Sequence, residues 1–262
     1  MTGKVWTVAR KELRDLGRRP GLLSGMVLPP LLLAALPGFV AAAITHDPHA
    51  LEQLQAAKFS GLDVAGLAPA AAATRIVVAQ FAAVYLLLPT MLSSVLASYS
   101  VVGEKVARTL EPLLATPVTV RELVLGKTLA VTVPALLATV GSATVGAAFM
   151  LIVSRPDAEA WQAICSSWPL ALGVVTPPLT LAADLLMLLV SARARDPRSA
   201  QQAAVLLILP IVGIIASQAA FRLVLGPGFY VTFSLVLGAL DVIILIVARP
   251  LFGREQILSR LG

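Results

Sequence analysis

The stretch Gly103–Lys127, GEKVARTLEPLLATPVTVRELVLGK, lies between two long apolar runs and decides which fold the chain can adopt. It is polar and charged, and it contains Pro112 and Pro117. Charged side chains and unpaired backbone groups cannot be left unsatisfied in lipid. In a chain this hydrophobic, the stretch must therefore project into water or dock on a partner, and the apolar runs beside it are expected to span a membrane.

The composition is that of a polytopic membrane protein. Hydrophobic residues make up 58% of the 262 residues, charged residues make up 13%, and the mean hydropathy is +0.90. Soluble domains carry about 25% charged residues. The net charge of +6 does not indicate a nucleic-acid partner, because the basic residues cluster beside apolar runs and no soluble domain offers a basic surface. Cys165 is the only cysteine, which excludes an intrachain disulfide and a thiolate metal site.

Six apolar runs reach the length of about 20 residues that a bilayer requires. They predict an all-α fold, a single membrane domain over residues 1–262, with spans at 22–45, 74–101, 123–153, 169–191, 201–225 and 229–248. Loops are expected at 46–73, 103–122, 154–168 and 192–200, with a tight turn at 226–228. Of the 20 Lys and Arg residues, 16 fall on the side of the termini and 4 on the other. The positive-inside rule therefore places both termini in the cytoplasm, in a cell (inner or plasma) membrane.

An amphipathic helix is predicted over residues 4–18, before the first span. Its apolar face comprises Val5, Ala9, Leu13 and Leu16, with Trp6 beside them, and its basic face comprises Arg10, Lys11, Arg14 and Arg18. Glu12 near the apolar edge makes the pattern imperfect. Such a helix is typical of the membrane interface, although a solvated lead-in to the first span would fit the same residues.

The polar loop 103–122 has an internal pattern of its own. Thr119-Val120-Arg121-Glu122 fits a capping box, which would start the third span's helix in water. Leu110, Leu113 and Leu114 form a small apolar patch on a short helix. Exposed apolar side chains in such a loop favour a partner protein, and the alternative is that they pack against the chain's own helix ends.

These residues resemble the cytoplasmic loop after the second span of type-2 ABC transporter permeases, the six-helix subunits of type V ABC exporters. The resemblance rests on TLEPLLATP at 109–117, and it extends to ARKEL at 9–13 and LFGREQIL at 251–258. It implies that a separate ABC ATPase, in two copies, engages the loop and holds ATP and Mg, and that two copies of this chain form a homodimer in the bilayer. The residues to which it gives the ATPase contact are Glu104, Arg108, Leu110, Glu111, Leu113 and Leu114.

No cofactor site or catalytic group is expected in this chain itself. Gly126-Lys127-Thr128 looks like the end of a phosphate-binding loop, but Arg121 stands where that motif requires a glycine. His46 and His49 flank a proline that makes a helical metal-ligand spacing improbable. The function that follows is a permease subunit without its own ATPase site, exporting an amphipathic or hydrophobic substrate or an ion.

Asp184 and Asp241 are the acids expected inside spans. An ionisable group at such a depth costs roughly 2.5–3.5 kcal/mol on insertion scales, so each is expected to face the bundle interior, a water path or a partner. They are candidates for a transport pathway, as a cation contact, a substrate contact or a protonatable site. A structural role is the alternative: a hydrogen-bonded helix clamp, or an acid paired with Arg193 or Arg249. An ion-coupled secondary transporter that uses both acids is the alternative function.

Overall fold

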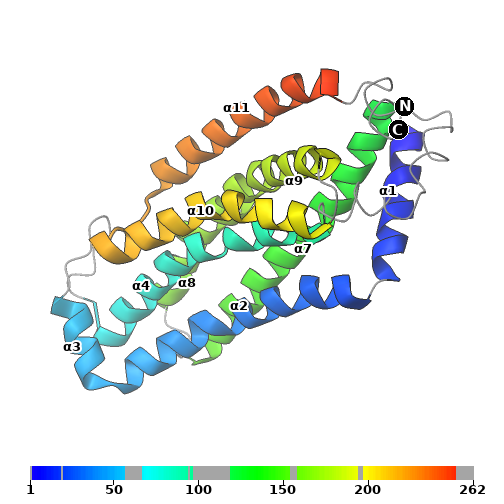
Figure 1. Ribbon diagram of the computed structural model, residues 1–262. Helices are drawn as coiled ribbons and strands as arrows, with labels where there is room; N and C mark the ends of the chain where they lie inside the picture. The colour runs from blue at the N-terminus through cyan, green and yellow to red at the C-terminus, as the bar shows by residue number, and fades with distance from the viewer. Residues whose placement is uncertain are drawn as a thin grey trace.

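The computed structural model of the protein describes residues 2–18, 20–56, 67–93, 95–96, 119–153, 158–193 and 197–251. Within these ranges the chain forms helices and short connections, with no strand (Figure 1). The predicted all-α membrane fold is confirmed.

Most of the described chain lies in long helices joined by short connections. In chain order they are α1 (Thr2–Gly17), α2 (Pro20–His46), α3 (Pro48–Ala56), α4 (Pro69–Val84), α7 (Val120–Val153), α8 (Ala158–Pro169), the π-helical segment η1 (Leu170–Val175), α9 (Thr176–Arg193), α10 (Pro197–Phe221) and α11 (Pro227–Leu251). A turn at 85–86 follows α4, and the helical path resumes over 87–93. The predicted tight turn at 226–228 was wrong in its position, because α10 ends at Phe221, the connection runs over 222–226, and Pro227 and Gly228 form the first turn of α11.

Five helical stretches of the described chain are long and apolar enough to cross a membrane. They are Ser24–His46, Ala71–Ser93, Glu122–Ile152, Leu170–Val190 and Pro227–Val247. The run predicted at 201–225 forms α10, but its apolar part is the shorter stretch Ile208–Phe221. A sixth membrane span at α10 therefore remains a prediction.

All four predicted loops are partly helical, since α7 begins at Val120 within 103–122 and α10 begins at Pro197 within 192–200. Within 46–73, Pro48–Ala56 forms α3, and α4 already begins at Pro69. Asp47 accepts a hydrogen bond from the backbone N–H of His49, and Pro48 follows at the first helical position, where a proline is tolerated. Within 154–168, α8 begins at Ala158 and continues through η1 into α9, so the loop prediction was wrong from that residue onward.

Prolines inside the spans leave backbone carbonyls without a helical donor, and neighbouring groups replace it. Pro37 cannot donate to the Leu33 carbonyl, which accepts from the Tyr85 hydroxyl at 3.4 Å. Pro178 cannot donate to the Val174 carbonyl, which accepts from the Ser234 hydroxyl at 2.9 Å. At these two prolines the lost backbone hydrogen bond is therefore replaced by a contact between helices.

The most extensive helix contact in the described chain is that between α2 and α7. Its closeness depends on small residues, since a side chain at Gly38 of α2 would collide with Phe149 of α7, and a Cβ at Gly146 of α7 would lie 2.9 Å from the Ala34 carbonyl oxygen of α2. Small residues therefore matter at this contact position by position, because Gly141 on the same helix has nothing within 4 Å of an added Cβ. The Tyr85 ring also meets Trp168 edge to face, with ring centroids 5.0 Å apart, at the centre of the apolar core.

The helices alternate in direction along the bundle, and α1 lies crosswise at the end where α2 and α7 begin (Figure 1). The ends of α9 and α11 lie toward that same end, whereas α3 and the α10–α11 connection lie at the other. Residues that the sequence assigned to one side of the membrane are therefore grouped at one end of the molecule.

Candidate functional site

The first turn of α7 carries the predicted capping box. The Thr119 hydroxyl accepts from the backbone N–H of Glu122 at 3.3 Å, and the Glu122 carboxylate accepts from the backbone N–H of Thr119 at 2.9 Å. The Thr119 hydroxyl also donates to that carboxylate at 2.9 Å. The reciprocal pair satisfies donors that the start of a helix leaves free, and it fixes where α7 emerges from the polar loop.

Helix α1 packs along the beginning of α7. Its residue Val8 sits over Gly126, where an added Cβ would lie 2.7 Å from the valine side chain and 3.0 Å from the Val5 carbonyl oxygen. Ala9 beside it is only 1% exposed. Glycine at position 126 therefore allows the two helices to approach as closely as they do.

An ion pair closes the same junction. Lys127 Nζ donates to Glu12 Oε1 at 2.9 Å, and the two side chains are only 3% and 16% exposed. A buried charge without a partner would cost several kcal/mol, so each charge accounts for the other. Glu12 interrupts the apolar face of α1 because that face is turned toward α7 and Lys127.

The Gly126-Lys127-Thr128 triplet thus has a structural explanation. Its glycine admits α1 and its lysine binds Glu12, on a helix instead of the strand-to-helix loop that a phosphate-binding motif requires. No local pattern in the sequence pairs Glu12 with Lys127, because the two residues are 115 positions apart. The available indication was that two opposite charges each lay in an apolar setting.

The residues predicted to contact an ATPase all lie outside the described residues. They are Glu104, Arg108, Leu110, Glu111, Leu113 and Leu114. The described chain shows only where their segment ends, at the capped start of α7 beside α1.

The predicted pathway acids lie in the bundle interior. Asp184 of α9 is fully buried, and its Oδ2 accepts a hydrogen bond from the Thr132 hydroxyl of α7. Asp241 of α11 is 5% exposed and close enough for its charge to act on Asp184. Ser93 is near Asp184, although its hydroxyl lies outside ordinary hydrogen-bond geometry.

The Thr132–Asp184 hydrogen bond joins α7 to α9, and it is the kind of contact that the structural interpretation describes. This hydrogen bond does not satisfy every polar atom around Asp184, however. Among the described residues, Oδ1 of Asp184, Oδ1 of Asp241 and the Ser93 hydroxyl are buried without a hydrogen-bond partner. Buried polar atoms normally have partners, so the clamp does not account for the whole cluster. The proposed pairing with Arg193 or Arg249 falls outside the side chains that the structure describes.

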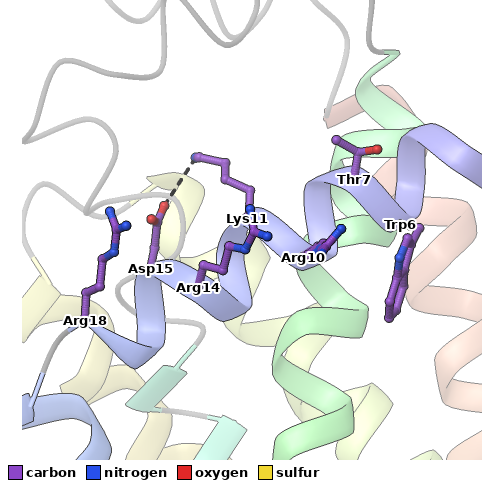
Figure 2. A pocket seen from close by; sticks show the side chains of 7 residues that line it. All are labelled: Trp6, Thr7, Arg10, Lys11, Arg14, Asp15 and Arg18. Atoms are coloured by element: carbon purple, nitrogen blue, oxygen red, sulfur yellow. Dashed lines mark ion pairs between the residues drawn. The ribbon is translucent and has the colours of Figure 1, made fainter.

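The outward face of α1 lines an open hollow of about 410 Å³ (Figure 2). The lining residues are Trp6, Thr7, Arg10, Lys11, Arg14, Asp15 and Arg18. Lys11 and Asp15 are 3.8 Å apart, as the dashed line marks. This basic face lies opposite the one that contacts α7.

In the described chain, five helices long and apolar enough to cross a membrane, with charged residues buried between them, are the features of a multi-pass membrane protein. The chain belongs to the ABC-2 family of transporter proteins, whose model matches residues 6–248. It is thus a type-2 ABC transporter permease, the transmembrane component and not the ATPase of such a transporter, and that family membership implies association with an ABC ATPase subunit. A comparison with curated proteins found no match.

Proposed function

We propose that this permease works as the membrane subunit of an exporter, which moves an amphipathic or hydrophobic substrate, or an ion, out of the cytoplasm. The family match over residues 6–248 is the observation that carries the proposal. Few charges lie within the spans, which suits a lipid-like or amphipathic cargo better than a highly charged one. ATP and Mg belong on the partner subunit.

The loop 103–122 is the proposed coupling element. Glu104, Arg108 and Glu111 orient the ATPase, and Leu110, Leu113 and Leu114 form the apolar anchor, as polar rims and apolar centres do in protein interfaces. Support comes from its end, since the loop runs into the capped first turn of α7. Closure of the ATPase pair on ATP would pull that end, and α7 would pass the movement into the bundle by a shift of conformational population.

Two copies of the permease and two ATPase subunits make up the proposed complex, with both permease termini in the cytoplasm of a cell membrane. The grouping of basic segments at one end of the molecule supports this orientation (Figure 1). A cysteine at Ser199 should resist an impermeant thiol reagent added outside, while one at Ala56 should react, after replacement of Cys165. The reverse pattern would overturn the orientation.

Asp184 and Asp241 are the proposed polar contacts of the transport pathway. Their unpartnered oxygens support this role, because a free carboxylate oxygen can accept a proton, a cation or a polar group of the cargo. Family membership makes an ATP-driven permease the favoured use of these acids over an ion-coupled secondary transporter.

The decisive experiment is a Leu113→Asp substitution in the co-expressed transporter. It places a charge in the proposed anchor, which costs several kcal/mol when that charge is buried and unpaired. Membrane insertion should survive, while co-purification of the ATPase or substrate-stimulated hydrolysis should fail. Complex formation and transport at wild-type levels in both Leu113→Asp and Glu104→Ala would show that the loop is not the coupling element.

A further inference from the structure

The two faces of α1 have different surroundings. Its apolar face is occupied, because Val8 packs on Gly126, Ala9 is 1% exposed and Glu12 binds Lys127. An amphipathic helix that lies on a membrane usually offers its apolar face to the lipid. In this protein that face is turned toward α7, so the polar face is what α1 presents to its surroundings.

The presented face is strongly basic. Trp6, Arg10 and Arg14 follow one another at helical spacing, and Thr7, Lys11, Asp15 and Arg18 form the adjacent row (Figure 2). Asp15 is its only carboxylate and lies 3.8 Å from Lys11. Among the described residues, no acidic side chain pairs with Arg10, Arg14 or Arg18.

The position of this face suits a headgroup layer. Helix α1 lies crosswise at the end of the bundle, where α2 enters the apolar region (Figure 1). Trp6 is 63% exposed, and tryptophan concentrates at the level of the headgroups. Guanidinium groups bind phosphate through paired, charge-assisted hydrogen bonds. We propose that the outward face of α1 binds the phosphate headgroups of anionic phospholipids, with Arg10, Arg14 and Arg18 as the main contacts.

Lipid bound to the outward face of α1 would act on α7 through α1 itself. The same helix that holds the headgroups on one face holds Gly126 and Lys127 on the other. Anionic lipid therefore orders α1 and stabilises its contact with the first turns of α7, next to the end of the loop 103–122. Through this contact the lipid composition of the membrane sets how firmly α1 holds the start of α7.

The test uses the full chain, without an ATPase, in lipid nanodiscs of phosphatidylcholine with or without phosphatidylglycerol. Lipids that remain bound after extraction are counted by mass spectrometry. Wild-type protein should enrich phosphatidylglycerol, and high salt should abolish the preference. A cation near an anionic surface contributes roughly fivefold in affinity, so R10Q/R14Q/R18Q should weaken the enrichment on the order of 100-fold.

Arg222→Gln is the matched control, since it removes an exposed arginine at the other end of the bundle and should leave the enrichment unchanged. If the triple variant fails to fold, R14Q alone and the salt dependence of the wild type decide the matter. The proposal would be overturned if R222Q weakened the enrichment equally, or if the lipid preference survived in the triple variant or in high salt. It would also be overturned if inorganic phosphate alone occupied the face and removed the bound lipid. The triple variant is also co-expressed with the ATPase in a separate experiment. If it then loses ATPase co-purification but keeps its lipid preference, the proposal is overturned and the face is a protein-docking surface. Because no ATPase is present in the lipid assay, its failure leaves the proposed transport function standing.

Discussion

The buried ion pair between Glu12 and Lys127 gives the sharpest test of the α1–α7 junction. Replacing Glu12 by glutamine keeps the shape of the side chain but removes the negative charge 2.9 Å from the Lys127 ammonium, whose side chain is 3% exposed. Breaking a buried pair costs about 3–5 kcal/mol. Glu12 is 16% exposed, and the glutamine amide oxygen still accepts a hydrogen bond, so we expect a cost below that range, about 2 kcal/mol.

That loss should appear as detachment of α1. A cysteine at Ala9, which is 1% exposed, reports detachment through its labelling rate, in a background where the exposed Cys165 is replaced. A change of about 2 kcal/mol corresponds to roughly 30-fold faster labelling when opening is rapid. The double variant E12Q/K127M should label more slowly than E12Q, since it removes the buried ammonium together with the carboxylate that faced it.

Asp15→Asn is the matched control, because it removes the same charge from the same helix. The Lys11–Asp15 pair is a surface pair with both side chains 46% exposed, and such pairs contribute about 0–1 kcal/mol. If E12Q labels no faster than D15N, or if the effects of E12Q and K127M simply add, the ion pair does not hold α1 on α7.

Three further predictions follow from single contacts. Gly126→Val places side-chain atoms against Val8, so it should destabilise the junction by about 1–3 kcal/mol in thermal unfolding, whereas Gly141→Val, with nothing within 4 Å, should not. Thr119→Ala removes the helix cap and should cost about 1 kcal/mol in the same measurement, with Thr119→Ser close to wild type; equal stability of all three proteins would argue against the cap. Asp184→Asn should alter transport in reconstituted vesicles while the assembled complex stays intact; a loss of yield or melting temperature alone would assign Asp184 to the helix clamp.

The parts of the fold that the sequence predicted well are those that depend on one local rule. Long apolar runs placed α2, α7 and α11 to within a few residues. The capping box at Thr119 was identifiable because both partners lie within one turn. Helix α8 was missed because its alternation of polar and apolar residues resembles a loop, and its helical state depends on packing against α4.

The candidate site was harder to predict from the sequence, because its contacts join distant parts of the chain. The Glu12–Lys127 pair spans 115 residues, and the Thr132–Asp184 contact spans 52. Each burial cost was visible in the sequence, but no local pattern says which partner offsets it. A search for opposite charges in apolar settings would have suggested Glu12 with Lys127, whereas the hydroxyl partner of Asp184 has many equivalents along the spans.

The burial of the second span has a consequence for how the chain is made. In the second span, Ala71–Ser93, 72% of an 18-residue apolar window is buried inside the protein, whereas the corresponding share in the span before it is 28%. Its main neighbour is α8, and the Trp168 indole that donates to the Val78 carbonyl lies 90 residues further along the chain. The ribosome therefore delivers the central helix before most of the surface that covers it exists. The Gln80 amide waits longer still, because it donates to the Leu223 carbonyl in the finished fold, so a nascent chain stalled before Ala158 should stay bound to the insertion machinery.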